Sequence, residues 1–171
     1  MIIFNRYMDL IKKISNIWTL LTLTVLILLI NTIVFPLLMT KDVKPLDTRF
    51  YYPPKEAVEY DLQLNKIEKT DSLLMHGTVD LLYPIIYTLL LSCIIFYQKG
   101  SKYLVSLPLA ALIADFLENI FIVLILYLSK QTIFYTSLTI GASIVTPLKW
   151  CSIILSFYVI IYLALRRIYE K

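Results

Sequence analysis

The residues with the greatest chemical potential are charged groups inside long apolar stretches. Asp115, Glu118 and Asn119 are spaced i, i+3 and i+4, which places them on one face of a helix, and Lys149 lies in another apolar stretch. Each ionisable group in a membrane helix costs about 3 kcal/mol on insertion scales, so none of them is expected to face lipid. Two carboxylates one turn apart ionise together only when a cation lies between them. We therefore expect Lys149 to neutralise one acid and leave the other for a proton, a cation or a ligand.

Polar side chains also share one face in each of the neighbouring apolar stretches. At about 1.5 Å per residue from the nearest basic residue at the opposite end, Tyr83, Glu118 and Lys149 all lie within one helical turn of the same height. These matching heights predict a polar pocket in the outer half of the membrane. Its candidate residues are Asp80, Tyr83, Asp115, Glu118, Asn119 and Lys149, with His76, Tyr87, Thr146 and Ser152 as secondary members.

The chemistry of this pocket stays open at the level of sequence. His76 is the single histidine, so neither a histidine-based metal site nor a cofactor is expected. The pocket is interpreted as a site for a small polar ligand, a lipid headgroup or an ion. The alternatives are a homodimeric proton- or cation-coupled transporter, a structural or accessory subunit with a buried ion pair, and a membrane-embedded lipid-modifying enzyme. The enzyme is the least favoured because no nucleophile motif or phosphate-binding loop accompanies the acids.

The composition defines the setting of these residues. Of 171 residues, 59% are hydrophobic and 16% are charged, and the mean hydropathy is +0.77. A soluble chain of this length has too little interior for so much apolar side chain. This excludes a cytosolic enzyme, a secreted disulfide scaffold and a disordered tail. We expect one all-α integral membrane domain over residues 1–171, a four-transmembrane-helix bundle whose approximate spans are 14–39, 79–98, 104–128 and 144–165.

The basic residues indicate topology rather than a nucleic-acid partner, because they flank the apolar stretches instead of forming one patch. By the positive-inside rule, both termini and the loop between the second and third spans face the cytoplasm, and the lipid bilayer of the cytoplasmic membrane is the expected partner. The residues that support this orientation are Arg6, Lys12, Lys13, Lys99, Lys102, Arg166, Arg167 and Lys171.

The nearly neutral segment 40–78 is expected to form the extracytoplasmic loop between the first two spans. Its proline-bearing first half, Thr40–Pro54, is predicted to be an extended or turning segment that lies on the membrane surface. A short amphipathic helix then begins at Pro54, with Tyr60, Leu64 and Ile67 in one apolar stripe. We interpret this helix as a lid over the ends of the spans, and a partner-binding arm is the alternative.

Three local signals concern the helices themselves. Thr70 or Asp71 is predicted to cap the helix leading into the second span. Within that span Pro84 lacks an amide hydrogen, which frees the carbonyl of Asp80 one turn earlier. Pro147 either starts the fourth span, which would leave 131–145 as a separate or re-entrant piece, or merely kinks a longer helix.

Three short patterns carry a resemblance to a family. They are D-x-x-Y-P at Asp80–Pro84, D-x-x-E-N at Asp115–Asn119 and T-x-x-K-W at Thr146–Trp150. With the proline-bearing loop, they make the chain after about Leu46 resemble a group of small, uncharacterised bacterial integral membrane proteins with four spans. The resemblance implies this architecture and these site residues, and no reaction. A homo-oligomer would use small residues for close contact, either Ala110, Ala111 and Ala114 or Gly141, Ala142 and Ser143.

Overall fold

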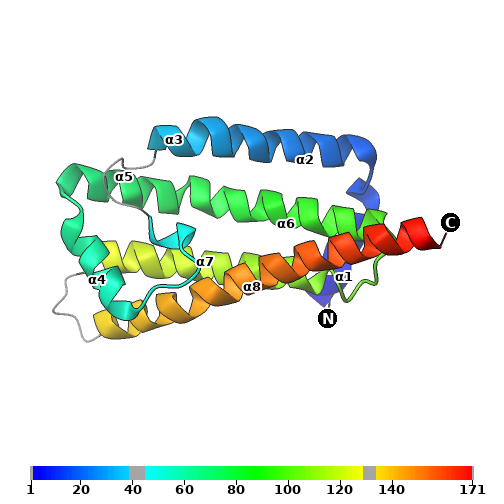
Figure 1. Cartoon of the computed structure of the whole chain (residues 1–171). Coiled ribbons are helices and arrows are strands. Elements are labelled where there is room, and N and C mark those ends of the chain that lie inside the picture. Colours follow the sequence, from blue (N-terminus) through cyan, green and yellow to red (C-terminus); the bar gives the residue numbers. More distant parts are fainter. Residues whose placement is uncertain (1, 39–44, 129–133, 171) are drawn as a thin grey trace.

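Four helical segments of the chain are long and apolar enough to cross a membrane. The computed structural model describes residues 2–38, 45–128 and 134–170, and every regular element in these ranges is helical (Figure 1). The four segments are Ile17–Leu38, Lys66–Tyr97, Ser106–Tyr127 and Phe134–Tyr169. The prediction of an all-α protein with four such helices is therefore confirmed, although the second and fourth begin earlier than expected.

The first candidate span follows a short amphipathic helix, α1 (Ile2–Ile14), and is the most exposed of the four. It consists of α2 (Ile17–Leu29), the π-helical turn η1 (Ile30–Val34) and α3 (Phe35–Leu38). None of the residues of α2 is buried, although the helix packs along α6 (Val79–Tyr97). Its apolar, uncovered surface is what a helix facing lipid requires.

Two helices separated by a short break lie between the first span and α6, and the second of them begins the second candidate span. α4 (Pro54–Gln63) begins with Pro54, as predicted, and α5 (Lys66–Gly77) follows after two residues. Asn65 caps α5 in a capping box with Glu68, so the predicted cap at Thr70 or Asp71 is wrong. The break also divides the predicted apolar stripe, because Tyr60 and Leu64 are buried while Ile67 is 74% exposed.

The loop before α4 and α4 itself pack onto this protein's own helices. Leu46 and Tyr52 are fully buried, so this loop enters the bundle rather than lying extended on a surface. They form one core with side chains of α4, α7 (Ser106–Tyr127) and α8 (Phe134–Tyr169), and Figure 1 shows α4 beside the start of α8. This packing supports the lid interpretation. The other core members are Ala57, Tyr60, Leu64, Ile122, Ile125, Leu126, Tyr135 and Ala142.

The fourth span is one continuous helix. α8 runs through Pro147, so a start at that proline is wrong and the alternative of a longer helix is correct from Phe134 onward; 131–133 lie outside the described residues. A proline removes only one intrahelical hydrogen bond, and long packing of α8 along α7 keeps the helix together. Ala142 and Ser143 are buried, as are Ala111 and Ala114, so these small residues serve packing within the chain.

The turn between α6 and α7 requires a small residue at Gly100. A Cβ atom there would lie 2.7 Å from the carbonyl oxygen of Ile95 and 2.9 Å from Cδ1 of Leu163, whereas one at Gly77 would meet nothing within 4 Å. We expect Gly100→Ala to lower the unfolding free energy by about 1–3 kcal/mol through this overpacking. Gly77→Ala is the matched control and should not be destabilised by overpacking. Unfolding of the detergent-solubilised variants checks this, and equal loss in both would contradict it.

Candidate functional site

A buried ion-pair cluster lies where α7 and α8 face each other. The ammonium of Lys149 pairs with the carboxylate of Glu118 and lies 3.7 Å from Oδ1 of Asp115. Lys149 is 4% exposed and Glu118 is fully buried. The structure therefore brings Asp115, Glu118 and Lys149 together, as their matching heights along the helices predict. Since α8 begins well before Lys149, this side chain does not extend past a helix end into solvent.

Each carboxylate oxygen of Glu118 faces a residue of α8, with Lys149 at Oε2 and Thr146 at Oε1. The hydroxyl of Thr146 lies 2.5 Å from Oε1 of Glu118 and 2.9 Å from the carbonyl oxygen of Ala142, and it can donate a hydrogen bond to either oxygen. The Tyr52 phenol from the loop is buried beside Thr146, and burial together with the negative Glu118 raises its pKa, so it remains neutral. Glu118 is thus held by Lys149 and Thr146, both from α8.

Asp115 is the acid that faces open space. Tyr87 donates a 2.9 Å hydrogen bond to its Oδ2, and the amide of Asn119 lies 3.4 Å from its Oδ1. Asp115 also lines the pocket described below, whereas Glu118 does not. Of the two acids that the sequence could not distinguish, Asp115 is therefore the one available to a ligand.

Asn119 connects α7 to α5 and α6. Its Nδ2 donates a 2.7 Å hydrogen bond to the carbonyl oxygen of Asp80, which Pro84 leaves without an intrahelical donor, as predicted. Its Oδ1 lies 3.2 Å from Nδ1 of His76, a ring that is completely buried. The same ring nitrogen lies 2.9 Å from Oδ2 of Asp80. His76 is therefore part of the polar interior.

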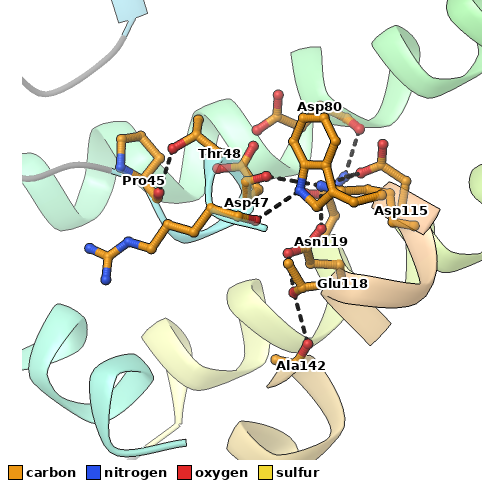
Figure 2. A network of polar contacts seen from close by, with 12 residues as sticks. Pro45, Asp47, Thr48, Asp80, Asp115, Glu118, Asn119 and Ala142 are labelled. Carbon is orange, nitrogen blue, oxygen red and sulfur yellow. Dashed lines mark hydrogen bonds and ion pairs between the residues drawn. The ribbon is translucent and has the colours of Figure 1, made fainter. Parts of the chain in front are cut away.

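The loop supplies functional groups that the sequence analysis did not select. Lys149 donates a 3.1 Å hydrogen bond to the carbonyl oxygen of Asp47, and the indole of Trp150 donates one of 2.8 Å to that of Arg49 (Figure 2). These bonds fasten the turn η2 (Leu46–Thr48) over the cluster. Helical spacing finds residues that share a face, but no periodicity marks a loop residue such as Asp47.

Two predicted members lie apart from the ion pairs. Tyr83 accepts a 3.0 Å hydrogen bond from Asn31 in η1 and makes an edge-on contact with Phe35, so its hydroxyl is turned toward the first span. Ser152 contributes its backbone carbonyl, which accepts a 2.8 Å hydrogen bond from the hydroxyl of Ser156. Tyr83 still lines the pocket, while Ser152 is not among its lining residues.

A pocket of about 410 Å³ opens beside this network, between the first span, α6, α7 and α8. One end is polar and contains Asp47, Asp80, Asp115 and Lys149. The remaining wall is mostly apolar and includes Ile27, Phe35, Leu90, Leu91, Ile153 and Phe157. The pocket thus has the two-sided character of a site for an amphiphilic molecule.

Comparisons with family models, with curated proteins and with solved structures find no match for this chain. The likeness to uncharacterised four-span proteins stays a prediction based on three short patterns. The function is accordingly inferred from the pocket and the ion-pair cluster.

Proposed function

We propose that this chain is a multi-pass protein of the cytoplasmic membrane that binds an amphiphilic, lipid-like ligand in the pocket between its first span and α6, α7 and α8. The observation that carries the proposal is the joining of a charged end and an apolar wall in one cavity. Such a cavity holds a headgroup and the first methylene groups of a chain, while the rest of the chain stays in the bilayer.

The orientation in the membrane follows from charge. In Figure 1 the N- and C-terminal ends lie at the same end of the bundle, as four successive spans require. The basic residues that flank the spans favour the cytoplasm for that end. This orientation puts α4 and the polar end of the pocket on the extracytoplasmic side.

The charges at the polar end select the headgroup. Three acidic residues, Asp47, Asp80 and Asp115, line the polar end of the pocket, and the charge of Lys149 is already matched by Glu118. A headgroup with an amine or several hydroxyl donors is therefore favoured over a bare anion, because donors and positive charge pair with carboxylates. Phosphatidylethanolamine is an abundant lipid whose headgroup carries an amine, and we choose it as the probe.

Filling the apolar wall tests the proposal. Ile153 lines the pocket, whereas its neighbour Ile154 is 54% exposed on the same helix. We expect Ile153→Trp to reduce co-purified phosphatidylethanolamine about tenfold, because the indole occupies the space of the lipid chain. Ile154→Trp should retain it. The measurement is native mass spectrometry of protein from mixed phosphatidylethanolamine and phosphatidylglycerol vesicles.

Two results would contradict lipid binding in this pocket. One is wild-type protein whose retained lipid has the same composition as the vesicles. The other is equal retention by Ile153→Trp and Ile154→Trp when both variants unfold at the same temperature as the wild type.

A further inference from the structure

We propose that Asp47, His76 and Asp80 bind one divalent transition-metal ion of the zinc type at the edge of the pocket. Each residue offers one ligand atom, a ring nitrogen or a carboxylate oxygen, and these three atoms lie within 4.8 Å of one another. They come from three different elements, the turn η2, the end of α5 and the start of α6. The site therefore exists only when the loop is closed over the bundle.

The spacing of the three atoms suits a small ion. A tetrahedral zinc ion with bonds of about 2.0–2.1 Å holds its ligands about 3.4 Å apart, so the three side chains need to close by only a small rotation. Three protein ligands leave one coordination position for water or for a ligand. Since Asp47 and Asp80 both line the pocket, that position is reached from the pocket side.

Two buried atoms at this place have no partner within the described part of the chain. Oδ1 of Asp47 and Nε2 of His76 are shielded from solvent and make no hydrogen bond there. Buried polar atoms are nearly always paired, so each such exception calls for an explanation. A bare imidazole nitrogen and a carboxylate oxygen are both electron-pair donors, and a metal ion satisfies both at once.

The negative charge around the three ligands also favours a bound cation. The described network gathers the carboxylates of Asp80, Asp115 and Glu118 around the single ammonium of Lys149, and Asp47 adds a further negative charge. An excess of buried carboxylates is costly unless a cation accompanies them, and a divalent ion supplies two positive charges.

The donor set favours a particular class of ion. One imidazole with two carboxylates suits Zn²⁺ or Mn²⁺, whereas Mg²⁺ and Ca²⁺ prefer oxygen ligands alone and more of them. Oδ1 of Asn119 lies 3.2 Å and Oδ2 of Asp80 lies 2.9 Å from Nδ1 of His76, so both fix the plane of the ring, which is the usual role of residues behind a metal-bound histidine. Nε2 of His76 and the second carboxylate oxygen of Asp80 are then the atoms offered to the ion. With an ion bound to Asp47 and Asp80, Asp115 is the acidic residue of the pocket lining that is left for the headgroup of the proposed ligand.

Metal binding by the purified, untagged full-length chain tests the site. After removal of metal with a chelator, we expect the wild type to take up one Zn²⁺ per chain and to bind Mg²⁺ at least a hundredfold more weakly. Asp47→Asn, His76→Gln and Asp80→Asn should each weaken Zn²⁺ binding by at least tenfold. Asp71→Asn removes an exposed carboxylate from the same helix as His76 and should bind like the wild type.

A second measurement uses the wild type alone, so it tests the site even if the variants do not fold. Co²⁺ added to the wild type should give a visible absorption band that one equivalent of Zn²⁺ abolishes, and Zn²⁺ should raise the unfolding temperature of the wild type relative to chelator-treated protein. The proposal is overturned if the wild type retains no stoichiometric Zn²⁺ or Mn²⁺. It is equally overturned if the folded ligand variants bind Zn²⁺ as tightly as Asp71→Asn does.

Discussion

Replacing Lys149 with methionine is expected to lower the free energy of unfolding by about 3–5 kcal/mol. The substitution keeps most of the side-chain volume but removes the ammonium that pairs with Glu118 and lies 3.7 Å from Asp115. Both carboxylates are then left in the interior without a counter-charge, which is the costly outcome for a broken buried pair. Unfolding of the purified protein in mixed micelles with increasing denaturing detergent measures the loss.

The partner substitution distinguishes a specific pair from general sensitivity at this position. Glu118→Gln alone should also destabilise, because it leaves Lys149 with only the more distant Asp115. The double variant Lys149→Met/Glu118→Gln should recover at least about 2 kcal/mol of the summed single losses, since of the two carboxylates only Asp115 is then left without a counter-charge. Strictly additive losses would contradict the pair.

An exposed ion pair on the same helix provides the control. Arg166 and Glu170 lie 2.7 Å apart, but both side chains are more than half exposed. Arg166→Met should change the unfolding free energy by less than about 0.5 kcal/mol, as is usual for surface pairs. Lipid retention by the double variant Lys149→Met/Glu118→Gln then distinguishes the two roles of the cluster. Recovered stability with loss of lipid supports a binding site. Recovered stability with normal lipid retention supports a purely structural pair.

The contacts that sequence could predict are those between regular helices. Asp115, Glu118 and Asn119 share a face because of the 3.6-residue period, and a constant rise per residue placed Lys149 at their height. Both rules hold along any helix and need no knowledge of how the helices pack. The freed carbonyl of Asp80 was predictable for the same reason, because a proline acts on the residue four positions earlier.

The contacts that sequence could not predict involve the loop and the helix ends. Asp47 and Tyr52 enter the site because tertiary packing buries Leu46, and nothing in their spacing shows this. Pro147 is compatible with both a first turn and a helix interior, and packing against α7 decided the outcome. Local competition decided the cap of α5, where Asn65 with Glu68 forms a reciprocal pair of bonds that Thr70 does not.

Asn119→Leu is expected to cost about 2–4 kcal/mol, the second largest effect among these substitutions. Leucine has the branched shape of asparagine but no polar atoms, so every hydrogen bond of this side chain is lost. The Asp80 carbonyl loses its 2.7 Å donor, and Nδ1 of His76 loses its 3.2 Å neighbour. The carbonyl of Asp80 is then buried without a donor, whereas Nδ1 of His76 keeps Oδ2 of Asp80 at 2.9 Å. The same detergent unfolding measurement, made in the presence of a chelator so that metal binding does not contribute, gives the loss.

Pro84 gives this prediction an internal test. Pro84→Ala supplies an amide hydrogen four residues after Asp80, and this hydrogen can bond to the same carbonyl that Asn119 serves. In the background of Asn119→Leu, we expect Pro84→Ala to recover about 1 kcal/mol, a coupling that two unrelated sites do not show. Pro147→Ala is the matched control, because it also restores an amide hydrogen inside a candidate span but acts on the carbonyl of Ser143. If Pro84→Ala and Pro147→Ala recover the same free energy of unfolding in the background of Asn119→Leu, the Asn119 side chain does not replace the hydrogen bond that Pro84 removes.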